Sequence, residues 1–139
     1  MDKQKNRIYA WEQVVVAPKD CIEISFAQIE PIVRHIWQQE GLEYPPQVLP
    51  RLRKKTKKAE GNRVGVWFGE KTYTWIVVHE LSHSMTSLCN GQSNWHGSLF
   101  MGIYCQLLSR YLHLDFQELV DSARQVGIHV KEDAKPVFV

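Results

Sequence analysis

Two histidines and a glutamate within one short stretch are the residues of this chain best suited to chemistry. His79, Glu80 and His83 form the pattern His-Glu-x-x-His in a segment that has no proline or glycine from Thr72 to Asn90. Residues four apart lie on the same face of a helix, so both imidazoles can share one metal ion. Glu80 lies about 100° further round the helix, close enough to reach a metal-bound water. The spacing therefore predicts a catalytic zinc site on one helix.

A catalytic zinc ion needs a further protein ligand, because such sites use three and keep a fourth position for water. His96 is the best candidate, since the polar stretch 90–95 lets the chain turn back towards the motif. Cys89 lies only about one and a half turns beyond His83 on the same predicted helix, where it would have difficulty completing a tetrahedron. Weaker alternatives are His35, His113, Glu118 and His129.

Glu80 and a tyrosine are the candidate catalytic groups. Glu80 would take the proton of the attacking water and pass it to the leaving amine. Tyr104 is the expected oxyanion donor, because it follows His96 and Phe100 at a spacing of four residues on one predicted helical face. Tyr111 and His113 are alternatives for that role. A ligand histidine could be oriented by Asp115, Glu118 or Asp121, although helix capping or surface exposure is the favoured explanation of these acids.

Composition limits the class of protein. A length of 139 residues with 44% hydrophobic content predicts one globular domain over residues 1–139. No apolar run approaches about 18 residues, so no membrane span is expected. The charged N-terminus lacks the apolar core of a signal peptide, and three cysteines without paired spacing favour reduced thiols. We therefore expect a cytoplasmic protein, with its oligomeric state left open.

The net charge of +2 is unevenly distributed. Residues 51–63 hold seven basic side chains and one acid, whereas the remainder holds 10 basic and 14 acidic residues. This segment fits a solvated edge hairpin whose charges prevent aggregation. It also fits contact with DNA phosphates, and an acidic peptide is a third possible partner. The candidate DNA-contacting residues are Arg51, Arg53, Lys54, Lys55, Lys57 and Lys58.

The first forty residues predict a strand and a helix. The β-branched content of Arg7 to Val16 indicates a strand. A helix follows from Ser25, which forms a capping-box pattern with Gln28, or alternatively from Pro31. Gly41 is expected to end that helix.

Two further strands are predicted before the motif. They cover about residues 48–57 and 63–68, and residues 59–62 read as the hairpin turn between them. Gly65, inside the second of these strands, would allow another backbone to approach closely.

Helices fill the second half of the chain. The motif helix is expected from an N-cap at Thr72 to a stop at Asn90 and Gly91, and the next helix spans about residues 97–111.

A last short helix runs to Val126, opened by Asp115 and Glu118 as a capping box and stopped by Gly127. The order of elements predicts an α+β domain. In it, a short, mostly antiparallel sheet packs on the motif helix, with two or three further helices.

The motif residues also carry a family resemblance. His79-Glu80-x-x-His83 followed by His96-Gly97-x-x-Phe100 resembles the SprT/Spartan-like minimal zincins, in which a third histidine follows a short loop and precedes glycine. With residues 4–12 and 123–128, nearly the whole chain is similar to a small, uncharacterised family of bacterial and phage metallohydrolases. The resemblance implies a zinc-dependent, minimal zincin-like domain with a short sheet packed on the active helix. SprT/Spartan relatives are linked to cleaving proteins crosslinked to DNA.

These observations predict a zinc-dependent hydrolase, and specifically a metallopeptidase in which Glu80 activates the zinc-bound water. A peptide or protein substrate would pair with an exposed strand edge near residues 63–68. The alternative is a non-catalytic module that is stabilised by zinc and binds nucleic acid or protein through the basic hairpin 51–63. The presence of Glu80 favours the enzyme, because a structural metal site does not need that carboxylate.

Overall fold

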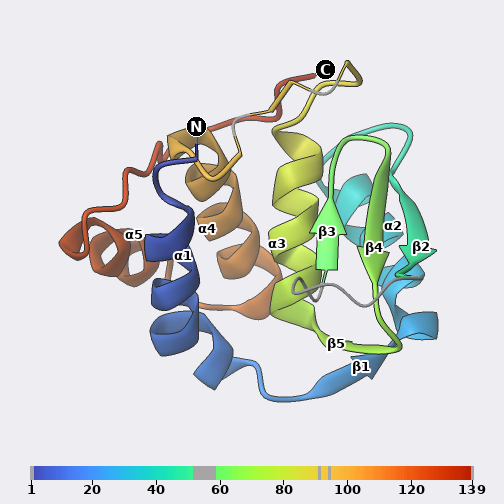
Figure 1. Ribbon diagram of the computed structural model, residues 1–139, viewed down its shortest axis with the longest axis horizontal. Coiled ribbons are helices and arrows are strands. Elements are labelled where there is room, and N and C mark those ends of the chain that lie inside the picture. Colours follow the sequence, from blue (N-terminus) through green and yellow to red (C-terminus); the bar gives the residue numbers. More distant parts are fainter. Residues whose placement is uncertain (1, 52–58, 91, 94, 139) are drawn as a thin grey trace.

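The computed structural model describes residues 2–51, 59–90, 92–93 and 95–138, which form an α+β arrangement of helices with two small sheets (Figure 1). The helices are α1 (Lys5–Trp11), α2 (Phe26–Gln39), α3 (Thr74–Met85), α4 (Ser98–Leu112) and α5 (Phe116–Gln125). The strands are β1 (Glu23–Ser25), β2 (Gln47–Pro50), β3 (Ala59–Gly61), β4 (Gly65–Phe68) and β5 (Lys71–Tyr73).

Helix α3, which carries the motif, lies between the two sides of the molecule. In Figure 1, α1, α4 and α5 lie on one side of it, and β2, β3, β4 and α2 lie on the other. Val77, Val78 and Leu81 of α3 have no exposed surface. A helix that is apolar on several sides is stable only when it is packed on several sides. The core therefore places the motif between helices and sheet.

The N-terminal segment is helical, so the predicted strand over Arg7 to Val16 is wrong. Helix α1 continues into a π-helical turn, Glu12–Val16, and then a 3-10 turn, Ala17–Lys19. Ile8, Trp11 and Val16 are buried, and the Trp11 indole donates to Ser122 Oγ at 2.9 Å. Contacts with the other helices thus outweigh the strand preference of the valine run.

Helix α2 confirms the start predicted at Ser25. The Ser25 N–H donates to Gln28 Oε1 at 2.8 Å, as in a capping box. Pro31 lies inside α2, so the alternative start at Pro31 is wrong. Gly41 has a φ of +74° and follows the last turn, which confirms it as the stop.

Three of the described strands form the larger sheet, in the order β2-β4-β3, with β2 parallel and β3 antiparallel to β4. Strands β1 and β5 form a separate antiparallel pair. The predicted turn at residues 59–62 is wrong, because residues 59–61 are strand β3. The turn lies instead at Asn62, whose side-chain oxygen accepts from the N–H groups of Val64 and Gly65 at 2.9 and 3.1 Å. The strand predicted over 48–57 is described only as β2, since residues 52–57 lie outside the described ranges.

The central place of β4 changes the expected substrate edge. Because β4 is paired on both sides, the edge predicted near residues 63–68 is wrong. Within the described ranges, β3 is an edge strand and lies beside α3 (Figure 1). The close backbone approach expected at Gly65 occurs at Gly61, where an added Cβ would lie 2.6 Å from the Glu80 carbonyl oxygen. At Gly65 an added Cβ would meet the Trp67 ring instead.

The motif helix is shorter than predicted at both ends. Thr72 belongs to β5, where it pairs with Ile24, and α3 ends at Met85. The chain then reverses, with Leu88 N–H donating to the Gln92 carbonyl at 2.7 Å. After this reversal the chain passes beside α3 again, so that His96 lies next to His83 before α4 begins.

The last two helices agree with their predicted ranges. Helix α4 differs from the predicted 97–111 by one residue at each end. The Asp115 side chain accepts from the Glu118 N–H at 2.9 Å, which confirms it as the cap of α5. Gly127, with a φ of +81°, follows the end of α5.

The basic segment 51–63 is described only at its ends. Arg51 lies 3.9 Å from the Glu60 carboxylate. The Arg63 guanidinium lies over the rings of Trp37 and Phe138, at 5.2 and 4.3 Å from their centroids. Both end residues thus have partners within the protein. DNA contact stays a prediction, because Arg53, Lys54, Lys55, Lys57 and Lys58 lie outside the described residues.

No helix in the described part of the chain is long and apolar enough to cross a lipid bilayer.

Candidate metal centre

Helix α3 places His79 and His83 one above the other, as their spacing predicts. Their ring centroids lie 5.1 Å apart, and the Phe100 ring of α4 stacks on His83 at 4.5 Å. His79 is buried and His83 is partly exposed. The pair therefore faces α4 from one side of α3.

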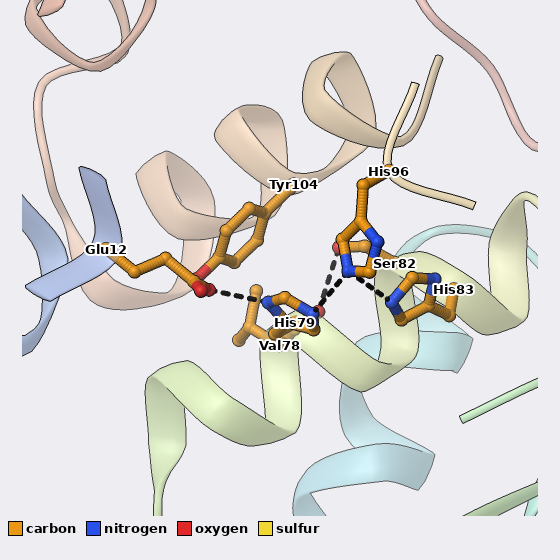
Figure 2. A network of polar contacts seen from close by, with 7 residues as sticks. All are labelled: Glu12, Val78, His79, Ser82, His83, His96 and Tyr104. Carbon is orange, nitrogen blue, oxygen red and sulfur yellow. Dashed lines mark hydrogen bonds and ion pairs between the residues drawn. The ribbon is translucent and has the colours of Figure 1, made fainter. Parts of the chain in front are cut away.

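His96 joins this pair from the residue before the N-cap of α4. Its Nε2 atom lies 3.3 Å from Nε2 of His79 and 3.2 Å from Nε2 of His83 (Figure 2). The three ligand atoms lie within 4.8 Å of one another, so this group could hold a metal ion. No other group of three such side chains occurs among the residues with described positions. The alternatives His35, His113, Glu118, His129 and Cys89 are not part of it.

Two carboxylates bind the far nitrogens of these rings. Glu12 Oε2 lies 2.5 Å from Nδ1 of His79, and Asp2 Oδ2 lies 2.5 Å from Nδ1 of His96. An ionised carboxylate only accepts hydrogen bonds, so we assign the proton of each neutral ring to Nδ1. The Nε2 atoms of both rings then carry lone pairs.

These two lone pairs face each other at 3.3 Å, which is not a hydrogen bond between neutral rings. Such an arrangement is stable when a cation lies between the nitrogens. Imidazole nitrogens of this tautomer are the usual ligands of zinc and other transition metals. The donor set therefore fits a metal ion on chemical grounds.

The two carboxylate-bound histidines differ electrostatically. Burial lowers the pKa of His79, but the charges of Glu12 and Glu80 outweigh it, and the pKa is raised overall. For His96, burial lowers the pKa by more than the hydrogen bond to Asp2 raises it. Acids raise the pKa of both rings, but the charge of His79 also lowers the pKa of His96.

Tyr104 lies on the predicted face of α4, with its ring 5.2 Å from that of His79, but its hydroxyl has a partner within the protein. Its side chain has no exposed surface, and its hydroxyl donates to Glu12 Oε2 at 2.6 Å (Figure 2). Because that hydroxyl proton is used within the protein, the geometry does not match an oxyanion donor. Burial, followed by the charge of Glu12, raises the pKa of Tyr104 well above its usual value. Tyr104 instead holds the carboxylate that binds His79.

Sequence reasoning missed the two acids that bind the rings of the candidate ligands. It named Asp115, Glu118 and Asp121, but Asp115 caps α5. Glu12 and Asp2 come from the N-terminal segment. Because that segment was predicted as a strand, the π-helical turn that buries Glu12 was not expected. The only sequence signal for Glu12 was its position just before the apolar residues 14–16. An acid beside an apolar run is too common to identify a residue that binds a histidine ring.

An open cleft of about 850 Å³ leads to the three histidines. Glu80 lines it, next to His79 on α3, and is 7% exposed. Tyr9 of α1 and Trp95 line the cleft beside His96, with the Tyr9 ring 5.3 Å from the His96 ring. Burial and the charges of Glu80, Glu12 and Asp2 raise the pKa of Tyr9 to about 12. Tyr9 therefore keeps its hydroxyl proton near neutral pH.

Strand β3 forms another wall of the cleft and is held closely against α3. The Ser84 hydroxyl donates to the Asn62 carbonyl at 2.7 Å. Gly61, which has no side chain, leaves room for the backbone of Glu80. The edge of the sheet thus lies directly beside the residue predicted as general base.

No family model, curated protein or solved structure matches this chain. The chemistry of the centre is therefore inferred from its own residues.

Proposed function

We propose that this protein is a zinc-dependent peptidase of the minimal zincin type, similar in plan to the SprT/Spartan-like proteins. The observation that carries the proposal is the convergence of three histidine Nε2 atoms beside Glu80 in one open cleft. A structural metal site has no need of a carboxylate at this position or of an open approach. The non-catalytic alternative is therefore less well supported.

The spacing of the ligand atoms supports zinc. Nitrogens bound tetrahedrally to zinc lie about 3.3 Å from one another, given zinc–nitrogen bonds of about 2.0–2.1 Å. The two Nε2 separations that involve His96 are 3.2 and 3.3 Å. Three neutral imidazoles with a fourth direction open to a cleft are typical ligands of a catalytic zinc ion.

His79, His83 and His96 would hold the ion, and zinc bound there would supply Lewis acidity to water and to a substrate carbonyl. Glu80 lines the same cleft and would act as general base, taking a proton from the attacking water. It would then deliver that proton to the leaving amine. Its burial limits the access of bulk water to the carboxylate.

The edge of β3 supports a peptide as substrate. An extended peptide can add to a strand edge through backbone hydrogen bonds, whatever its side chains are. Because Gly61 packs against the Glu80 backbone, a peptide bound along β3 would run past the three histidines. We assign substrate binding to this edge, in place of the paired strand β4.

Tyr9 replaces Tyr104 as the proposed oxyanion donor. It lines the cleft, is 38% exposed, and lies with its ring 6.1 and 5.3 Å from the rings of His79 and His96. A hydroxyl that keeps its proton at neutral pH can stabilise the negative charge that develops on the carbonyl oxygen.

The decisive experiment measures metal content and peptide hydrolysis in the same samples. The wild-type protein is expected to bind one zinc ion and to cleave a fluorogenic peptide library. Glu80→Gln should keep the zinc and lose about 10²–10⁴-fold in rate, because only proton transfer is removed. Glu118→Gln is the matched control, since Glu118 is an exposed glutamate of α5 that does not line the cleft. Undiminished hydrolysis by Glu80→Gln would refute the proposed mechanism.

A further inference from the structure

One short segment, residues 2–12, supplies both carboxylates that bind the ligand histidines. Glu12 reaches His79 and Asp2 reaches His96, although the paired residues are 67 and 94 positions apart in the chain. The same segment supplies Gln4, whose amide donates to the His96 carbonyl at 2.9 Å. The N-terminal segment therefore contacts two of the three proposed metal ligands.

Glu12 is held more rigidly than an ordinary surface acid. Its Oε2 atom accepts from Nδ1 of His79 at 2.5 Å and from the Tyr104 hydroxyl at 2.6 Å (Figure 2). The residue is 3% exposed and begins the π-helical turn that follows α1. Such turns are rare and are found frequently at functional sites. The turn thus presents a buried carboxylate to one defined ring nitrogen.

Asp2 is held less tightly, although its contact is similar. Its side chain is 18% exposed, against 4% for Glu12. Gln4 strengthens this end of the segment, because its Oε1 atom also accepts from the His129 N–H at 2.6 Å. Both the ring and the backbone of His96 are therefore bound by residues 2–4.

We propose that Glu12, assisted by Asp2, is a positioning residue that fixes the ligand rings with Nε2 turned towards the metal. This inference rests on the proposed zinc centre. A neutral imidazole has two tautomers and can rotate, so either ring nitrogen can present a lone pair to an ion; the combination found here has the proton on Nδ1 and Nε2 facing the other rings. A carboxylate on Nδ1 selects that combination before the metal arrives. Loss of such a partner commonly lowers metal affinity by about 10–100-fold.

The test measures zinc affinity by competition with a chromophoric chelator, together with the thermal stability of the metal-free protein. Glu12→Gln should weaken zinc binding by about 10–100-fold with the stoichiometry unchanged, and Asp2→Asn by less. Glu40→Gln is the matched control, because Glu40 Oε2 also accepts a tyrosine hydroxyl, from Tyr111 at 2.6 Å. This control should lose stability without any change in zinc affinity. Unchanged affinity in Glu12→Gln would overturn the inference.

A second readout uses the wild-type protein and so does not depend on the folding of a variant. Nitrogen-15 NMR of the histidine rings distinguishes zinc bound at Nε2 from zinc bound at Nδ1. We expect His79 and His96 to bind zinc through Nε2 and to carry the proton on Nδ1. Binding through Nδ1 at either ring would overturn the proposal.

The test of the positioning role can fail or succeed independently of the test of peptidase activity. A wild-type protein that binds zinc but cleaves no peptide would refute the peptidase and leave the affinity difference measurable. A protein that cleaves peptides but binds zinc equally well with and without the Glu12 carboxylate would refute only the positioning role.

Discussion

The two sides of the candidate metal centre are built in different ways. On the α3 side, His79, Glu80 and His83 come from five consecutive residues of one buried helix. On the opposite side, His96 comes from the start of α4, and the acids that orient the rings come from the N-terminal segment. The residues of the first side are brought together by helix formation alone, whereas those of the second side meet only when the whole chain has folded. The second side is therefore what distinguishes an assembled centre from an accidental His-Glu-x-x-His pattern.

The largest expected effect comes from removing the ligand on the opposite side. Zinc at about a thousand times its Kd should stabilise the wild-type protein by about 4 kcal/mol. His96→Ala should lose most of this gain, because two histidines of α3 alone bind zinc weakly. Thermal unfolding with and without zinc measures the difference. His35→Ala, which changes a histidine outside the cluster, should keep the full gain. A full zinc-dependent shift in His96→Ala would show that α3 is sufficient.

A tyrosine on the opposite side should affect the rate more than the stability. Tyr9→Phe is expected to lower kcat by about 10²–10³-fold while zinc content stays at the wild-type level, since one oxyanion donor is lost. Steady-state kinetics on a fluorogenic peptide tests this expectation. Tyr111→Phe is the control, because its hydroxyl binds Glu40 instead of lining the cleft. Equal rates in the two variants would remove Tyr9 from the site.

A substitution at the contact between β3 and α3 tests how stability and peptide binding depend on the packing of the strand against the helix. Gly61→Ala places a Cβ 2.6 Å from the Glu80 carbonyl oxygen, so strand and helix must move apart. We expect a loss of about 1–3 kcal/mol in the free energy of unfolding, together with weaker peptide binding. Urea denaturation and KM measure the two effects. Gly69→Ala is the control, because an added Cβ there meets nothing within 4 Å.

The smallest effect concerns an acid that sequence reasoning had offered as a ligand-orienting group. Asp115→Ala removes the cap of α5 and should lower stability by about 1 kcal/mol. Zinc affinity should stay unchanged, since Asp115 binds the Glu118 N–H instead of a histidine. Denaturation and chelator competition test both statements together. A drop in zinc affinity would show that α5 is coupled to the centre.

Much of the helical structure was predictable from local signals. The cap at Ser25, the cap at Asp115 and the stops at Gly41 and Gly127 act within one helical turn, and each lies where it was predicted. Strand β3 was mistaken for a turn, because three residues give too little pattern to reveal a strand. The N-terminal valines were mistaken for a strand, because their preference is weaker than the packing of α1.

The sequence by itself determined that His79, Glu80 and His83 share a helix, and it named His96 as the third candidate ligand. The tertiary structure alone decided which acids bind the rings, because Glu12 and Asp2 reach residues 67 and 94 positions away. It likewise placed the Tyr104 hydroxyl on Glu12 and a strand edge beside Glu80. Helical spacing is fixed by backbone geometry over a few residues, whereas contacts between distant segments depend on how the whole core packs.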